Sequence, residues 1–135
     1  MVVAIANTND DIIELLRMVL ERDGFATAVV HLVDIKNGRA DFTEFLEQHD
    51  PAGIIFDIPP PYDDNWTFVA TLRQLPAMKQ RAVVITTTHK AHLERLVGES
   101  TGALEIIGKP NDTYEVLEAV KRELQRMGRM DSTAA

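Results

Sequence analysis

The chain of 135 residues contains no cysteine. This absence excludes disulfide bonds and thiolate chemistry, and it is typical of proteins that stay in a reducing compartment. Basic residues are also in the minority: 14 lysines and arginines stand against 21 aspartates and glutamates, so the formal net charge is −7. Since no basic stripe offsets this charge, we expect no nucleic-acid-binding surface.

The sequence also lacks long hydrophobic runs. No segment approaches the roughly 18 apolar residues of a membrane span, and the start "MVVAIANTND" has neither the basic nor the apolar part of a signal peptide. We therefore expect a cytoplasmic protein that makes no contact with membranes. The length predicts one domain, over residues 1–126, followed by a disordered tail or linker at 127–135.

Five short apolar runs, rich in β-branched residues, alternate with segments of helical period. We predict strands at residues 2–6, 27–30, 53–56, 82–86 and 103–107, and helices that begin near residues 11, 41, 65, 90 and 112. This alternation predicts a parallel sheet covered on both faces. The expected fold is α/β and doubly wound, a flavodoxin-like five-stranded sheet in the order 2-1-3-4-5 with five helices.

Two helices have clear sequence signals. Asp11 and Glu14 resemble a capping box at the start of the first helix, and Asn111 is the expected N-cap of the last. The apolar faces of these two helices are expected to comprise Ile12, Leu15, Leu16, Val19 and Leu20 in the first, and Tyr114, Leu117, Val120 and Leu124 in the last.

In a sheet of this kind the functional site lies beyond the carboxyl ends of the strands. Asp57 is expected there, because it ends the buried run of "GIIFDIPPP" and three prolines follow it. A carboxylate, a hydroxyl and an ammonium on one sheet edge suit phosphoryl chemistry, with the carboxylate as nucleophile. The polar residues expected at this edge are Asn7, Thr8, Asn9, Asp57, Thr87, Thr88 and Lys109.

With these residues in place, residues 1–125 resemble the receiver domains of bacterial two-component response regulators. The resemblance rests on "IIFDIPPPYDDNW", "VVITTT" and "GALEIIGKP", and on their order and spacing. It implies that Asp57 is the phosphoacceptor, Thr87 the switch hydroxyl and Lys109 the basic partner of the phosphoryl group. It also implies a Lys109–Pro110 bond that is often cis, which proline permits.

The resemblance further implies a phosphoacceptor signalling domain rather than an enzyme, with at most weak self-phosphorylation and dephosphorylation chemistry. Its expected partners are a sensor histidine kinase or phosphotransfer protein, and a downstream protein. Mg²⁺ is the expected cofactor, held by Asp57 and the backbone carbonyl of Pro59, and no organic cofactor is expected.

Four positions depart from the family pattern. Asn7 and Thr8 stand where receivers carry an acidic pair, Ile106 replaces an aromatic residue, and Asn65 replaces a glycine. Because Mg²⁺ prefers carboxylate ligands, we expect metal binding at Asn7 and Thr8 to be weak or lost. Phosphoryl transfer to an aspartate relies on a cation, so it should be slow.

Asp10 and Asp11 could serve as the acidic pair only if the first strand continued through residues 7–9. We reject this register, because acids are favoured at a helix N-terminus by the helix dipole. The segment at residues 34–40 is about five residues longer than in the family and is predicted to be a surface loop.

Three functions from different classes can be weighed. Asp57, Thr87 and Lys109 favour a receiver that accepts a phosphoryl group, whereas the lost acidic pair and aromatic residue favour a degenerate receiver that binds partners without phosphorylation. Asp57 and Lys109 could also be no more than a structural ion pair, and Thr87 no more than the end of a strand. A flavodoxin-like cofactor protein or α/β enzyme is disfavoured, because "NTNDD" contains no glycine for a phosphate loop.

Two further motifs have simple interpretations. His89 and His92 lie three residues apart near a helix start, and without an evident third ligand we favour a solvated helix face over a metal site. The prolines at 59–61 are interpreted as a rigid active-site loop rather than a docking segment.

In the family, partners or a second copy dock on the fourth helix, fifth strand and fifth helix. A homodimer through this surface would use a self-complementary patch, in which Glu118 and Arg122 could pair within the last helix. Because Ile106 is not aromatic, we expect any association to depend little on Asp57. The residues expected on this patch are Glu115, Glu118, Lys121, Arg122 and Arg126, around Leu117, Val120 and Leu124.

Overall fold

The computed structural model describes residues 1–98, 105–108 and 113–130. Its centre is a parallel sheet with the strand order β2-β1-β3-β4-β5, which confirms the predicted order. The strands are β1 (Val2–Ala6), β2 (Ala26–Val30), β3 (Gly53–Ile58), β4 (Ala82–Thr87) and β5 (Glu105–Gly108).

The described residues form one helix more than the five predicted. The helices are α1 (Asp10–Arg22), α2 (Leu32–Lys36), α3 (Phe42–His49), α4 (Tyr62–Arg73), α5 (Lys90–Val97) and α6 (Thr113–Arg126), and a 3₁₀ turn, η1, spans Pro76–Met78. Within the described ranges, no helix has the length and apolar character needed to cross a membrane.

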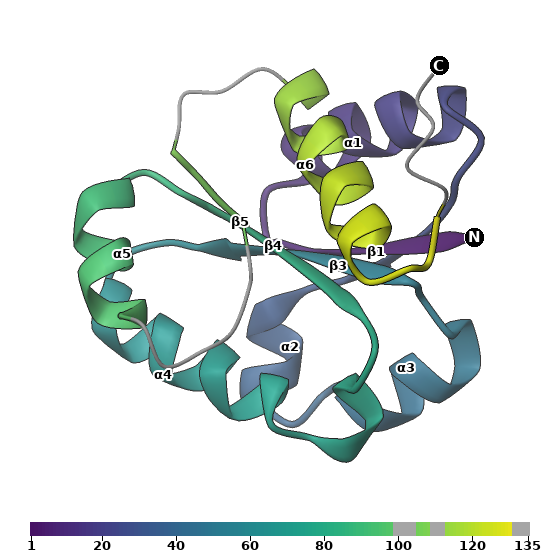
Figure 1. Cartoon of the computed structure of the whole chain (residues 1–135). Coiled ribbons are helices and arrows are strands. Elements are labelled where there is room, and N and C mark those ends of the chain that lie inside the picture. Colours follow the sequence, from purple (N-terminus) through teal and green to yellow (C-terminus); the bar gives the residue numbers. More distant parts are fainter. Residues whose placement is uncertain (99–104, 109–112, 131–135) are drawn as a thin grey trace.

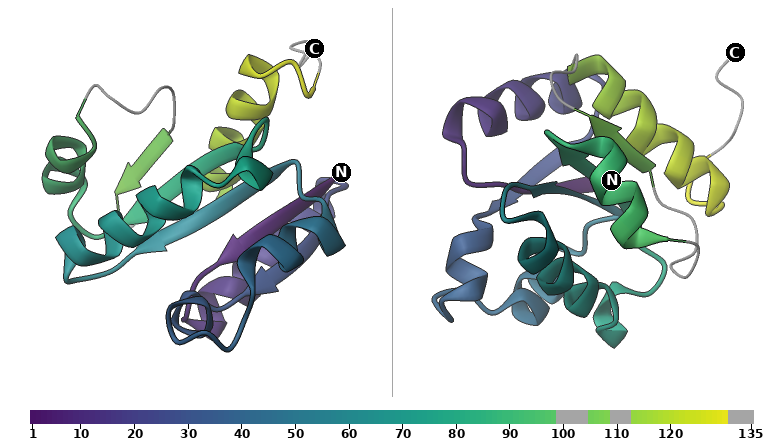
Figure 2. Two further views of the ribbon diagram at one scale, coloured as in Figure 1. Left: turned by 90° about the horizontal axis from the view of Figure 1, so that it is seen from below. Right: turned by 90° about the vertical axis from the view of Figure 1, so that its left-hand side faces the viewer.

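Helices cover both faces of the sheet, as Figures 1 and 2 show. One face carries α1 and α6, and the other carries α2, α3, α4 and α5. Every residue of the central strands β3 and β4 is buried, because apolar helix side chains pack on both sides of them. Because an apolar core fills each face of the sheet, polar residues of these strands can form a site only at the strand ends.

The extra helix α2 lies in the segment that the sequence analysis predicted as a loop. Leu32, its first residue, is buried in the core on this face of the sheet, and Ile35 packs against the same core. The prediction was wrong for residues 34–36, because the surrounding residues are polar although Leu32 and Ile35 have helical spacing, whereas residues 37–40 lie in no helix or strand. This helix brings Lys36 to the carboxyl edge of the sheet.

The start of α1 differs from the predicted capping box. Asn9 is the N-cap, and its side chain accepts hydrogen bonds from the backbone N–H groups of Asp11 and Ile12 at 3.0 and 3.2 Å. Asp11 lies in the first turn of the helix, where its negative charge interacts favourably with the helix dipole. Leu15, expected on the buried face, is 48% exposed.

The last helix places most of its predicted face in the core. Leu117, Val120 and Leu124 are buried, as predicted, but Tyr114 is 49% exposed. The predicted N-cap Asn111 and the first two residues of the predicted fifth strand, 103–104, lie outside the described residues.

Part of the expected tail contacts the domain. Met127 and Met130 pack against the core beneath α6, and the Arg129 guanidinium donates a hydrogen bond to the backbone carbonyl of Gln80 at 2.6 Å. Residues 131–135 lie outside the described residues.

Candidate functional site

Asp57 is the second-to-last residue of the central strand β3, and 6% of its surface is exposed. Side chains alternate between the two faces of a strand. Ile55 packs in the core beneath α1 and α6, whereas Phe56 and Ile58 pack in the other core. Asp57 therefore belongs to the α1–α6 side of the sheet, where the strand ends.

Thr86, which the sequence analysis did not single out, contacts this carboxylate. The hydroxyl of Thr86 donates a hydrogen bond to Asp57 Oδ1 at 2.8 Å, and both residues are buried. They are directly opposite each other in the register of β3 and β4. Since a hydrogen bond to a charged acceptor is stronger than one between neutral groups, Thr86 fixes the orientation of the carboxylate.

Thr87, the predicted switch hydroxyl, is oriented differently. Its hydroxyl donates to the backbone carbonyl of Ile58 at 3.0 Å and lies 3.4 Å from the backbone nitrogen of His89. It follows Thr86 in the strand and so lies on the opposite face. Its switch role stays a prediction, as does that of Lys109, which lies outside the described residues together with Pro110.

A cavity of about 240 Å³ opens beside Asp57. Residues from five different elements and loops line it, so it forms only when the chain folds. The lining residues are Asn7, Thr8, Leu32, Val33, Lys36, Asp57, Pro59, Pro61 and Asn65.

The end of β1 confirms where the two neutral residues lie. The strand stops at Ala6 and α1 begins at Asp10, so Asn7 and Thr8 line the cavity and Asp10 lies in the helix. Asn7 is buried, and its side-chain oxygen accepts hydrogen bonds from the backbone N–H groups of Thr8 and Asn9 at 2.6 and 3.0 Å. The alternative register with Asp10 and Asp11 as the acidic pair is therefore excluded.

Two of the oxygens that were expected to hold Mg²⁺ already accept hydrogen bonds. The Pro59 carbonyl accepts a hydrogen bond from the side-chain amide of Asn65 at 2.8 Å, and the Asn7 oxygen accepts two. Asp57 is the one carboxylate among the described cavity residues, and the described ranges contain no group of three or more His, Cys, Asp or Glu suited to a metal. With one carboxylate, the described cavity residues are a poor fit for a divalent cation, which prefers several carboxylate oxygens.

The histidine pair belongs to a polar cluster between α4 and α5. His89 caps α5 by accepting from the backbone N–H of His92, and His92 lies 2.9 Å from the Asp63 carboxylate. The ring of Tyr62 contacts both imidazoles edge-on, with centroids 5.8 Å apart in each case. This cluster joins the starts of two helices, and His92 is half-buried rather than fully solvated.

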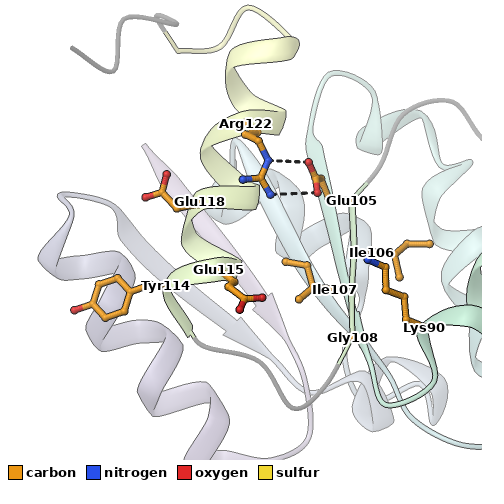
Figure 3. Close-up of a pocket in the computed structure, with 9 residues that line it drawn as sticks. All are labelled: Lys90, Glu105, Ile106, Ile107, Gly108, Tyr114, Glu115, Glu118 and Arg122. Carbon is orange, nitrogen blue, oxygen red and sulfur yellow. Dashed lines mark hydrogen bonds and ion pairs between the residues drawn. The ribbon is translucent and has the colours of Figure 1, made fainter.

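The predicted partner surface contains a second, larger cavity, of about 720 Å³, between α5, β5 and α6. Figure 3 shows Glu115 and Glu118 from α6 on one side of it and Lys90 from the start of α5 on the other. Arg122 does not pair with Glu118 as the sequence suggested, but with Glu105 on β5 through two hydrogen bonds of 3.0 and 3.3 Å. The hydrogen bonds that Arg122 donates to the Glu105 carboxylate raise the pKa of Arg122.

Two other predictions for this surface are corrected by burial and pairing. The apolar residues Leu117, Val120 and Leu124 face the core, so they cannot form the centre of a contact patch. Lys121 lies near Asp23 at 3.4 Å and Glu118 at 3.9 Å, and Arg126 pairs with the buried Glu123 at 3.1 Å. Ile106 is partly buried against the core between the sheet and α5.

The chain is similar to proteins named as a response regulator, a transcriptional regulatory protein and a signal receiver domain. No protein-family model matches the chain. It is 33% identical over 92 residues to response regulator Rre1 of Synechocystis sp., covering 68% of this chain and 39% of Rre1. It is 25% identical over 124 residues to transcriptional regulatory protein GltR of Pseudomonas aeruginosa, covering 92% of this chain and 49% of GltR. The chain thus spans less than half the length of these two relatives.

A solved structure agrees with these relatives. The signal receiver domain of a signal transduction histidine kinase from Syntrophus aciditrophicus superposes with a TM-score of 0.72 at 25% identity, covering 99% of this chain and 97% of that domain.

Proposed function

Because this chain belongs to the receiver domains of response regulators, we propose that it accepts a phosphoryl group on Asp57 and passes the signal to a partner protein. The donor in this proposal is a phosphohistidine of a sensor kinase or phosphotransfer protein. The observation that carries the proposal is the Asp57 carboxylate, oriented by Thr86 at 2.8 Å and opening onto a cavity of about 240 Å³.

The proposed reaction is a displacement at phosphorus. A carboxylate oxygen of Asp57 forms a bond to the phosphorus atom, and the bond between phosphorus and the donor's nitrogen or oxygen breaks. The electron pair of the broken bond stays with the donor, which leaves as an imidazole after taking up a proton, or as a carboxylate when an acyl phosphate is the donor. The product is an acyl phosphate on Asp57. Thr87 and Lys109 keep their proposed roles as switch hydroxyl and basic partner on the strength of the family resemblance.

Intact mass spectrometry tests this function. The full chain is incubated with acetyl phosphate, and we expect the mass gain of one phosphoryl group, which peptide mapping assigns to Asp57. Asp57→Asn is the control, because it removes the nucleophile and keeps the size of the side chain. A mass gain that persists in Asp57→Asn would contradict the assignment.

A degenerate receiver is the second candidate, favoured by the neutral residues Asn7 and Thr8 at the cavity. Such a domain would bind its partner in one state only. It predicts no modification of Asp57 by acetyl phosphate or by a phosphorylated kinase, and a partner affinity that Asp57→Asn does not change.

The surface formed by α5, β5 and α6 is the proposed route by which the signal leaves the domain. Its cavity of about 720 Å³ combines the exposed ring of Tyr114 with charges of both signs, a mixture suited to a polar protein interface. Downstream proteins and a second copy of the chain are both candidates for this surface, and sedimentation of the chain by itself detects the second.

A further inference from the structure

Lys36 adds a basic side chain to the lining of the Asp57 cavity. Lys36 comes from α2, the helix formed by the longer segment between β2 and α3. It lines the same cavity as Asp57. Helix α2 is therefore the element that brings Lys36 to the site.

Two contacts define where the ammonium lies. Lys36 Nζ donates a hydrogen bond to Asn65 Oδ1 at 2.5 Å, and it lies 5.6 Å from the centroid of the Phe68 ring, within the range of a cation–π contact. Both partners belong to α4, so the ammonium is held between α2 and α4 although the residue itself is exposed.

Asn65 connects Lys36 to the loop that follows Asp57. Its amide nitrogen donates to the Pro59 carbonyl at 2.8 Å, while its oxygen accepts from Lys36. The orientation of this amide is determined, because an ammonium can only donate and a carbonyl can only accept. The carbonyl expected to bind Mg²⁺ thus takes part in a chain of hydrogen bonds that ends at a cation.

We propose that the ammonium of Lys36 is a resident cation of the Asp57 cavity, in addition to the role proposed for Lys109, and that it neutralises charge there in place of Mg²⁺. A like charge in the cavity opposes a divalent cation, and the Pro59 carbonyl already accepts a hydrogen bond from Asn65. A phosphoryl group brings about 1.5 to 2 negative charges to Asp57, and a lysine ammonium is a common partner for such a group. This inference rests on the proposed phosphoryl acceptance at Asp57.

A lysine that only ties α2 to α4 would make the same contacts. The two interpretations differ in what happens when the charge alone is removed. Lys36→Met removes the charge and keeps the length of the stem over Phe68, whereas Lys36→Arg keeps the charge. Lys79→Met is the matched control, because Lys79 is exposed and does not line the cavity.

The first measurement is a Mg²⁺ titration by calorimetry, with Trp66 fluorescence as a second signal, and it needs no phosphodonor. Trp66 follows Asn65 in α4, and its side chain is buried in the core. We expect wild type to remain unsaturated at about 1 mM Mg²⁺, and Lys36→Met to bind Mg²⁺ at least about fivefold more tightly, because a like charge has left the cavity. Lys36→Arg and Lys79→Met should match wild type. Equal affinities for wild type and Lys36→Met would overturn the inference.

The second measurement is the rate of Asp57 modification by acetyl phosphate, in EDTA and in Mg²⁺. We expect the wild-type rate to change less than about threefold between the two, and Lys36→Met to be at least about tenfold slower in EDTA, because a preorganised charge stabilises the transition state. A wild-type rate that requires Mg²⁺, with Lys36→Met equal to Lys79→Met in EDTA, would overturn it.

The two measurements also separate this inference from the proposed function. If Asp57 is modified in no variant, the proposed function fails, and the Mg²⁺ titration by itself upholds or overturns Lys36 as a resident cation. If Lys36→Met does not fold, Asn65→Ala replaces it in the titration. That variant releases both Lys36 and the Pro59 carbonyl, so it too should bind Mg²⁺ more tightly than wild type, and an unchanged affinity would count against the inference.

Discussion

Thr86, and not Thr87, donates a hydrogen bond to the carboxylate of Asp57, at 2.8 Å. The two threonines are neighbours in β4, but their side chains lie on opposite faces of the sheet. Thr86 orients the proposed nucleophile directly, whereas the hydroxyl of Thr87 donates to the backbone carbonyl of Ile58, the residue after Asp57. The family spacing pointed to Thr87. Because the two hydroxyls contact different groups, their roles can be tested separately.

Thr86→Val should therefore slow the modification of Asp57 more than Thr87→Val does. The substitution keeps the side-chain shape and removes the hydroxyl, so the carboxylate loses its fixed orientation, and we expect a rate lower by about tenfold or more. The measurement is the initial rate of mass gain with acetyl phosphate for both variants and wild type. A Thr86→Val rate equal to wild type, with a slower Thr87→Val, would show that Thr87 alone matters for acceptance.

Any self-association through the α5–β5–α6 surface should depend little on phosphorylation, whereas the contact with a downstream protein is the one proposed to transmit the signal. Ile106 is packed against the core beside α5 and has no aromatic ring to move when the state of Asp57 changes. Sedimentation of wild type and Asp57→Asn, each with and without acetyl phosphate, should give the same oligomeric state in all four samples. A dimer that forms only when wild type meets acetyl phosphate would show that self-association is coupled to the state of Asp57, against this prediction.

The Glu105–Arg122 pair offers a way to disturb this surface without disturbing the fold. Arg122 is exposed, and an exposed ion pair contributes about 0 to 1 kcal/mol to stability. Arg122→Glu should leave the unfolding transition nearly unchanged and weaken any dimer that sedimentation detects. The double variant Glu105→Arg/Arg122→Glu restores the pair with its charges exchanged. If the dimer recovers in the double variant, the dimer requires an intact ion pair between positions 105 and 122. If the dimer is lost in both variants, the second copy contacts the individual charges of Glu105 and Arg122.

The two ends of the apolar stripe on α6 should differ sharply in their effect on stability. Leu124 is fully buried, so Leu124→Ala should lower the free energy of unfolding by about 2 to 5 kcal/mol. Tyr114 is 49% exposed, so Tyr114→Ala should change it by about 0.5 kcal/mol or less. Urea unfolding followed by Trp66 fluorescence measures both. A large loss at Tyr114 would mean that its ring packs as the sequence pattern suggested.

The start of α1 gives a second test of the structure against the sequence pattern. Asn9→Ala removes the side chain that caps the helix and should cost about 1 kcal/mol of unfolding free energy. Asp11→Ala keeps this cap and should lose only the dipole interaction, about 0.3 to 1 kcal/mol. The same urea experiment compares the two, and a larger loss for Asp11→Ala would favour the capping box read from the sequence.

The sequence determined the architecture because the signals for it are local. Five apolar runs separated by helical segments leave few ways to bury both faces of the strands, so the sheet order and the position of Asp57 at the end of β3 followed from the pattern. The neutral residues Asn7 and Thr8 were placed correctly for the same reason, since a helix N-terminus attracts the acids that follow them.

The tertiary structure decided which side chains meet. Thr86 and Asp57 are 29 residues apart, and so are Lys36 and Asn65. The first contact depends on the register between β3 and β4, where a slip of one residue would turn each side chain to the other face. The second depends on α2, whose few apolar residues form a helix only because Leu32 is buried against the core. Contacts of this range arise from packing between distant segments, and for that reason the resident lysine of the Asp57 cavity could not be read from the chain alone.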